Sequence, residues 1–143
     1  MGKSFFGLLL VGLIGTFVTS TSASAHGALA IGGNTSEVAT KGIAFGDSYN
    51  YNTKAEADAR ALQECEKRRA ELTVAPCQII ADFTRQWVFI SMDPAAGTPG
   101  FGWSVDTDRA TAEGNAINQC KASSPDDRKQ FCVVSQFYHD EKP

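Results

Sequence analysis

One passage of this sequence is written twice, and the repetition constrains the fold more than any other feature. Residues 45–65 read FGDSYNYNTKAEADARALQEC, and residues 101–120 read FGWSVDTDRATAEGNAINQC. Each passage ends in a cysteine, and a second cysteine follows twelve residues later. A shift of 55 residues also carries alanines of one copy onto alanines of the other: Ala55, Ala57 and Ala61 onto Ala110, Ala112 and Ala116. So many matches in the same order indicate an internal duplication.

Each copy is predicted to form two strands, a helix and a third strand. In the first copy we expect strands at Gly27–Gly32, Lys41–Asn52 and Cys77–Phe83, a polar loop at Gly33–Thr40, and a helix from Thr53 to about Arg69. In the second copy we expect strands at Trp87–Met92, Gly100–Val105 and Phe131–Tyr138, and a helix from Asp108 to near Cys120. These elements predict an α+β fold: two tandem strand-strand-helix-strand repeats that form one antiparallel or mixed sheet, with both helices on one face.

Side chains at the helix starts support this plan. Thr53 can cap the backbone amide of Glu56, whose carboxylate can reach back to Thr53. Asp108 takes the same place in the second copy. Small residues are expected on the face of the first helix that lies against the sheet: Ala55, Ala59, Leu62 and Cys65.

The first residues have the pattern of a secretory signal peptide. Lys3 precedes the apolar run Phe5–Val18, and Ala23–Ala25 supplies small residues at a cleavage site. The run is shorter than the ~20 residues that a membrane-spanning helix needs. We therefore predict a signal peptide at residues 1–25 and a secreted or periplasmic location. The rest, residues 26–143, is predicted to be a single duplicated domain, with repeat one at about 27–83 and repeat two at about 87–138.

The four cysteines are predicted to form disulfides, as is usual in exported proteins. Four cysteines allow three pairings, and the duplication favours one of them, Cys65 with Cys77 and Cys120 with Cys132. A zinc site is the alternative, but structural zinc sites ordinarily use cysteine pairs spaced by two to four residues. A redox-active pair is disfavoured because the sequence has no C-x-x-C motif.

With its repeats laid out, the chain resembles a bacterial family without an assigned activity, domain-of-unknown-function family 4189. The resemblance rests on the order of the following elements: an apolar start at Gly27–Gly32, a glycine-serine-tyrosine stretch at Gly46–Tyr51, an alanine-rich helix at Glu56–Cys65, a strand that begins with Cys77, and the repetition of this cycle from Trp87 to Val134. It implies an exported α+β domain and no particular reaction.

Charge argues against nucleic acid as a partner. The 143-residue chain has a formal net charge of −3, and its basic residues are interspersed with acidic ones. Nucleic-acid binding requires basic residues gathered on one face to neutralise phosphates. After the predicted signal peptide no segment is apolar enough to insert into a membrane, so membrane insertion is not expected.

Residues for catalysis or metal binding are few. Ser48 and Ser104 follow Phe-Gly-x in the two copies, but neither lies in a G-x-S-x-G nucleophile motif. Copper binding is an alternative if cleavage leaves His26 as the first residue, because its amine and imidazole, with His139, suit that ion. A hydrolase that uses two carboxylates is another. The carboxylates considered for it are Asp47, Glu56, Asp58, Asp82 and Asp106. No metal or other cofactor is predicted.

The leading hypothesis is a small non-enzymatic domain that binds a protein or another macromolecule of the envelope or extracellular space. Candidate binding residues are the aromatic side chains of the second strand of each copy: Tyr49, Tyr51, Phe101 and Trp103. Phe101 and Trp103 are two residues apart and share one face of their strand. If no helix covers that face, these rings would form a platform for a partner.

Overall fold

The computed structural model describes residues 25–141, so the predicted signal peptide, except for Ala25, lies outside the described residues. The elements in chain order are β1 (His26–Gly32), a 3₁₀ turn (Thr35–Glu37), α1 (Val38–Lys41), β2 (Ala44–Tyr51), α2 (Lys54–Arg69), β3 (Cys77–Phe83), β4 (Trp87–Met92), β5 (Phe101–Asp106), α3 (Arg109–Ser123), a second 3₁₀ turn (Lys129–Phe131) and β6 (Val133–His139). Within these residues no helix has the length and apolar character needed to cross a membrane.

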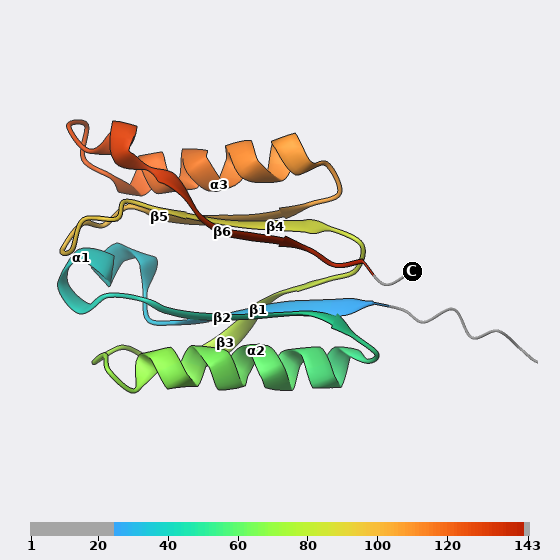
Figure 1. Cartoon of the computed structure of the whole chain (residues 1–143). Coiled ribbons are helices and arrows are strands. Elements are labelled where there is room, and N and C mark those ends of the chain that lie inside the picture. The colour runs from blue at the N-terminus through green and yellow to red at the C-terminus, as the bar shows by residue number, and fades with distance from the viewer. Residues whose placement is uncertain (1–24, 142–143) are drawn as a thin grey trace, which may run out of the picture.

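The fold is α+β, as predicted, but the prediction of a single sheet is wrong. Each copy forms its own three-stranded antiparallel sheet, with the order β2-β1-β3 in the first and β5-β4-β6 in the second. The two sheets face each other at the centre of the molecule, α2 covers the outer face of the first, and α3 covers the outer face of the second (Figure 1). The helices therefore lie on opposite sides and not on one face.

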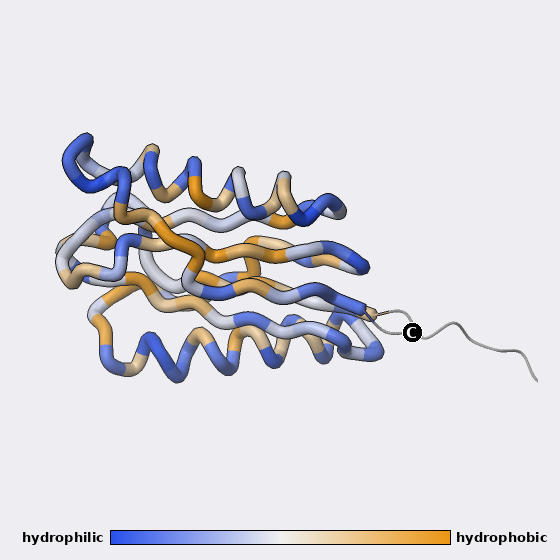
Figure 2. The backbone as a smooth tube through the Cα atoms, turned by 45° about the horizontal axis from the view of Figure 1, so that its top comes forward, coloured by the Kyte–Doolittle hydropathy of each residue, from blue (hydrophilic) through white to orange (hydrophobic). Residues whose placement is uncertain are grey.

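The central strands explain why two sheets form. Leu29 of β1 and Val88 of β4 point into the core between the sheets, whereas their neighbours Ala30 and Phe89 point toward α2 and α3. Strands that are apolar on both faces must be covered on both. The helix covers one face and the other copy covers the second. Figure 2 shows the apolar segments gathered in the strands, with hydrophilic residues along the outer turns of the helices.

The repeated Phe-Gly-x-Ser motif holds each helix close to its sheet. A Cβ added at Gly46 would lie 2.2 Å from the carbonyl oxygen of Ala61, and one added at Gly102 would lie 2.3 Å from that of Ala116. Ser48 is almost fully buried; its Oγ donates to the carbonyl of Ala57 and accepts from the amide of Ala28. The motif is therefore explained by packing and by the tie between helix and strands.

Both predicted helix caps are confirmed, and several boundaries change. Thr53 and Glu56 form a complete capping box, and the side chain of Asp108 accepts from the amide of Thr111. The predicted second and last strands are shorter or shifted, α3 extends beyond Cys120 to Ser123, and the predicted polar loop contains a 3₁₀ turn and α1.

The predicted sheet-facing side of α2 is correct at Leu62 and Cys65 and wrong at Ala55 and Ala59. The residues that the helix buries are Ala57, Ala61 and Cys65, whereas Ala55 and Ala59 are exposed. Alanine occupies four nearby positions of this helix, so its spacing alone did not distinguish the two faces.

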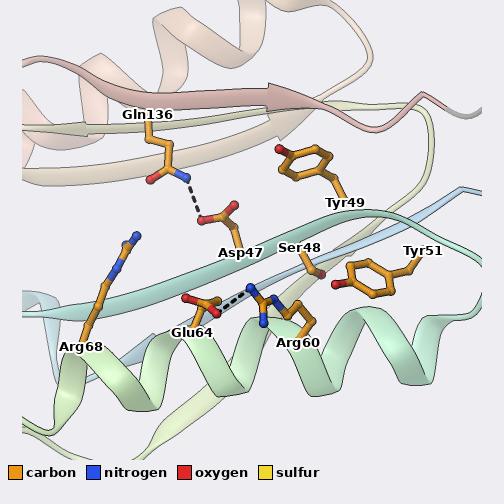
Figure 3. Close-up of a pocket in the computed structure, with 8 residues that line it drawn as sticks. All are labelled: Asp47, Ser48, Tyr49, Tyr51, Arg60, Glu64, Arg68 and Gln136. Atoms are coloured by element: carbon orange, nitrogen blue, oxygen red, sulfur yellow. Dashed lines mark hydrogen bonds and ion pairs between the residues drawn. The ribbon is translucent and has the colours of Figure 1, made fainter.

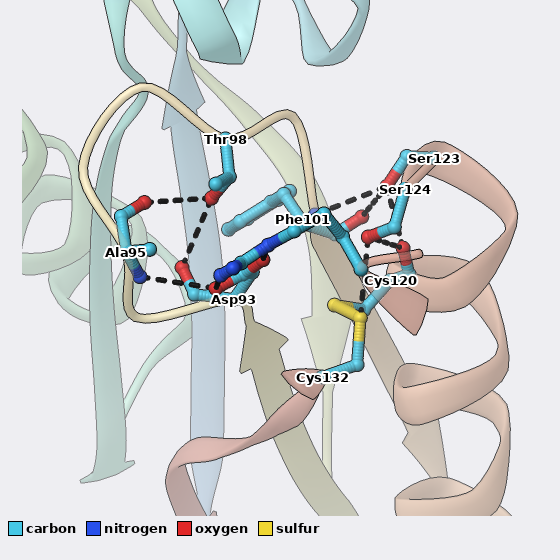
Figure 4. The surroundings of a disulfide bond; sticks show 9 residues. Asp93, Ala95, Thr98, Phe101, Cys120, Ser123, Ser124 and Cys132 are labelled. Carbon is cyan, nitrogen blue, oxygen red and sulfur yellow. Dashed lines mark hydrogen bonds and ion pairs between the residues drawn. A yellow bond between two sulfur atoms is a disulfide. The ribbon is translucent and has the colours of Figure 1, made fainter. Parts of the chain in front are cut away.

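Both expected disulfides are present, Cys65–Cys77 and Cys120–Cys132. Each bridge joins the last part of a helix to the start of the next strand or its approach. Figure 4 shows the second bridge beside Ser124, whose hydroxyl donates to the carbonyl of Cys120. In the same region Arg128 forms two hydrogen bonds with the buried carboxylate of Asp93, of 2.8 and 2.7 Å. This pairing lowers the pKa of Asp93.

A buried carboxylate joins the two copies at one end of the molecule. Asp140 is fully buried, and it accepts hydrogen bonds from the backbone amides of Asn50 (2.7 Å) and Arg85 (3.4 Å). Both of these residues have a positive φ, 62° and 54°. Asp140 thus connects the end of β2, the turn between the copies and the segment after β6.

Candidate functional site

The structure does not bring the four candidate aromatic residues to one surface. Phe101 is a core residue, 3% exposed, and Trp103 packs beside it against the core between the sheets. Their face of β5 is free of a helix, as the platform hypothesis requires, but the other sheet covers it. Tyr51 packs under α2, and only Tyr49 is largely exposed, at 48%. The hypothesis of a common aromatic platform is therefore corrected.

A β-bulge explains why Tyr49 and Tyr51 separate. Between the pairs Ala28–Ser48 and His26–Tyr51, β1 contributes one residue and β2 contributes two. The additional residue reverses the alternation of side chains beyond it. Tyr49 therefore points toward the second sheet, where its ring stacks on Tyr138 with 5.3 Å between centroids, and Tyr51 points toward α2.

The bulged region borders a polar pocket of about 360 Å³ on the edge where β2, α2 and β6 meet (Figure 3). Its lining comes from both copies: Asp47, Ser48, Tyr49, Tyr51, Arg60, Glu64, Arg68 and Gln136. Gln136 of β6 donates to Oδ1 of Asp47 over 2.8 Å, which joins the two sheets across the pocket. Two acidic and two basic side chains thus lie around one small opening.

Two of these four charges neutralise each other, and two do not. Arg60 is ion-paired with Glu64 at 2.8 Å, and Glu64 also binds Lys67. The hydrogen bond from Lys67 and the charge of Arg60 lower the pKa of Glu64. Arg68 lies over the ring of Phe45, 4.2 Å from its centroid.

Within residues 25–141, Arg68 forms neither an ion pair nor a side-chain hydrogen bond, and Oδ2 of Asp47 accepts no hydrogen bond. Figure 3 shows the guanidinium and the carboxylate as separate groups on the same side of the pocket. Burial raises the pKa of Asp47, although the hydrogen bond from Gln136 and the charge of Arg68 oppose the rise. The pocket therefore presents a free cation and a partly desolvated carboxylate.

Asp47→Asn is expected to stabilise the domain at neutral pH by a few degrees in its thermal midpoint. A carboxyl whose pKa is raised by folding binds its proton more tightly in the folded state, so its ionised form costs stability above that pKa. Asparagine keeps the acceptor for Gln136 and removes the charge. Thermal unfolding of both proteins is measured between pH 3 and pH 8. The difference between their thermal midpoints should disappear as the pH falls from the raised pKa of Asp47 in the folded protein to its pKa in the unfolded chain.

Asp126→Asn is the matched control for this prediction. Asp126 is highly exposed, and its hydrogen bond with Lys129 lowers its pKa. Its replacement should give no gain in the thermal midpoint at neutral pH. A lower midpoint of Asp47→Asn would mean that the charge of Asp47 supports the fold, contrary to its raised pKa.

The equivalent edge of the second copy has a depression of about 320 Å³, and none of the residues that line it is charged. Repeat alignment places neutral residues where the first copy has charges: Trp103 for Asp47, Asn115 for Arg60, Gln119 for Glu64 and Ser123 for Arg68. Ser123 and Gln119 bind the backbone of β5, at Phe101 and at Trp103. Both copies have the same fold, so this fold does not by itself call for charged residues at these positions.

The sequence singled out Asp47, Ser48, Tyr49 and Tyr51, but not the other side chains that line the pocket. A signal for them was present in the sequence. Arg60, Glu64 and Arg68 are spaced by four residues and therefore share one face of a helix, and all three are neutral in the second copy. Gln136 gave no comparable signal because it lies 89 residues from Asp47.

The remaining candidate carboxylates have other partners. Lys54 bridges Asp58 at 2.6 Å and Asp82 at 2.8 Å. Glu56 belongs to the capping box, and Asp106 accepts from the amide of Asp108. These contacts are those of caps and surface ion pairs.

The two histidines lie on different sheets. His26 is on β1, and His139 is on β6, where its ring stacks on Trp87 with 4.4 Å between centroids. In the described part of the chain no three His, Cys, Asp or Glu side chains gather into a group that could hold a metal ion.

A further apolar region lies on the outer face of β6. Phe137 is 52% exposed and stacks on Phe89 with 5.4 Å between centroids. The guanidinium of Arg109 lies over both Trp87 and Phe137, so this surface is already shared with a cation of α3. On the opposite edge of the molecule Trp103 borders two further depressions, one of about 360 Å³ beside β3 and one of about 320 Å³ beside α3.

These observations define a class of protein: a duplicated α+β domain with two face-to-face sheets, one disulfide in each copy, and a pocket that is lined by charged residues in the first copy and by neutral ones at the equivalent edge of the second. The chain belongs to the family described as domain of unknown function (DUF4189), whose model matches residues 26–137. No curated protein and no solved structure matches it.

Proposed function

We propose that this protein is an exported, non-enzymatic binding domain that recognises a protein or another macromolecule of the envelope or extracellular space. The pocket between β2, α2 and β6 is its recognition site. The observation that carries the proposal is the difference between the copies: one edge has acquired charged side chains that the fold does not need. Groups kept at a cost to stability are typical of functional sites.

Export is supported by the apolar leader and by the two disulfides, which form and persist in oxidising compartments. A non-enzymatic role is supported by the contacts of the candidate catalytic groups, most of which are already held in hydrogen bonds or ion pairs within the domain. Ser48 is tied to two backbone groups, and most of the candidate carboxylates serve as caps or ion pairs. Asp47 is the exception, and it shares the pocket with Arg68, which has no ion-pair partner among residues 25–141, an arrangement suited to recognition.

A carboxylate hydrolase is the second candidate, and one observation favours it. The pKa of Asp47 is raised and that of Glu64 is lowered in the same pocket, as in pairs that act as acid and base. Against it, Glu64 is held by two cations, Arg60 and Lys67, which leaves its carboxylate poorly placed to attack or to activate water.

The proposal is tested by affinity capture with the immobilised domain from the medium and envelope fractions of the producing cells. Three forms are compared: the unaltered protein, Arg68→Gln, and Lys121→Gln as a control that removes a cation from α3. We expect at least one species that the unaltered protein and Lys121→Gln retain and that Arg68→Gln retains about tenfold less. No retained species, or equal retention by all three forms, contradicts the proposal. Recovery of the ligand as cleaved products would favour the hydrolase.

A further inference from the structure

The open edge of β2 distinguishes the pocket from an ordinary polar depression. β2 and β5 are both edge strands, with a partner strand on one side only. In β5 three outward backbone groups are occupied: Ser123 donates to the carbonyl of Phe101 and accepts from its amide, and Gln119 accepts from the amide of Trp103. The second copy therefore closes this part of its own edge with helix side chains.

The first copy lacks these closing side chains. The counterparts of Ser123 and Gln119 are Arg68 and Glu64, and neither binds the backbone of β2 within residues 25–141. By the equivalence of the copies, the outward backbone groups of β2 belong to Phe45 and Asp47. An unpaired strand edge is a template for another extended chain. Here that edge runs along the floor of the pocket, between α2 and β6.

We propose that this pocket binds the carboxyl-terminal residues of an extended polypeptide, with the terminal carboxylate on Arg68 and the peptide main chain paired with the open edge of β2. The inference rests on the proposed function and specifies the ligand class for the same site. Arginine presents a planar fork of donors that matches a carboxylate, and among the residues that the structure describes the donors of Arg68 have no hydrogen-bond acceptor. Strand addition and carboxylate capture are established modes of peptide recognition.

The remaining groups of the pocket fit the same ligand. Oδ2 of Asp47 can accept from a main-chain N–H of the peptide, which would compensate the burial of this carboxylate. Tyr49, which is 48% exposed, offers a ring face to an apolar side chain at the border of the pocket. The pocket volume of about 360 Å³ suits a short terminal segment and not a long strand.

The opposite charges of Asp47 and Arg68 also limit the class of ligand that the pocket can bind. Asp47 and Arg68 together leave this side of the pocket without net charge, so a densely charged anion would meet Asp47 as well as Arg68. A single carboxylate with a neighbouring N–H donor satisfies both groups. A free amino acid has this chemistry too, and the test must separate the two sources.

The experiment uses an array of degenerate hexapeptides displayed with free carboxyl termini, beside the same peptides with amidated termini. The labelled domain is applied as unaltered protein, as Arg68→Gln and as Lys121→Gln. We expect binding to a subset of the free-carboxylate peptides and at least a tenfold loss on amidation. We expect a similar loss for Arg68→Gln and none for Lys121→Gln. Two-dimensional NMR spectra of both variants establish that they remain folded.

Each other outcome overturns the inference. Equal binding to amidated peptides would remove the role of the carboxylate, and unaffected binding by Arg68→Gln would remove that of Arg68. If no peptide binds, carboxyl-terminal peptides are excluded as the class of ligand. Competition by a mixture of free amino acids at the concentration of the peptides would make a small zwitterion the ligand. If capture depends on Arg68 while the array is negative, the proposed function stands and only the ligand class fails.

Discussion

Gly46→Ala is expected to destabilise the domain by about 3 kcal/mol or more, above most of the range for overpacked cores. The added methyl would lie 2.2 Å from the oxygen of Ala61 and 2.2 Å from the amide nitrogen of Cys65. Both atoms belong to the backbone of α2, so relief requires movement of the whole helix away from β2. A loss of this size corresponds to a fall in Tm on the order of 10 °C. Thermal and urea unfolding measure it.

The chain offers a control with the same chemical change and the opposite expected sign. Gly114 lies within α3, and a Cβ added there meets nothing within 4 Å. Alanine is the better helix former by about 0.5–1 kcal/mol, so Gly114→Ala should stabilise. Gly102→Ala should behave like Gly46→Ala, because its methyl would lie 2.3 Å from the oxygen of Ala116. A tolerated Gly46→Ala would contradict the close packing of α2 on β2.

Removal of either disulfide is expected to cost about 3 kcal/mol, within the range found for small exported domains. Each bridge closes a loop with a sequence separation of 12, and opening it increases the freedom of the unfolded chain. Each bridge also ties a helix to the strand of its sheet on which that helix packs least. For example, α2 packs mainly on β2 and β1, and its disulfide joins it to β3. The measurement is urea unfolding of the double variants Cys65→Ala with Cys77→Ala, and Cys120→Ala with Cys132→Ala.

Reduction of the unaltered protein provides the control, since it opens both loops without changing the sequence. Each double variant should lose part of the stability that reduction removes in total. If a double variant unfolds at the same urea concentration as the unaltered protein, that bridge contributes nothing to stability. The predicted structural role of its cysteines would then be excluded.

Local spacing in the sequence was sufficient for the repeat, most elements, both helix caps and the cysteine pairing. The capping box at Thr53 and the N-cap at Asp108 depend on residues three positions away, so a short stretch contains the whole interaction. The twelve-residue spacing of the cysteines, present in both copies, selected one pairing of three. The strands Cys77–Phe83 and Trp87–Met92 were predicted with their observed bounds, because each is bordered by turn residues and rich in apolar ones.

The tertiary structure alone decided how the two copies meet and where the pocket lies. The apolar runs of β1 and β4 were compatible with burial on both faces, but they did not specify a second sheet as the cover. The face of α2, the bulge that separates Tyr49 from Tyr51, and the contact of Asp47 with Gln136 depend on partners distant in the chain. Periodicity describes the neighbours of a residue along its own element, whereas these features arise from packing between elements, which a local pattern does not encode.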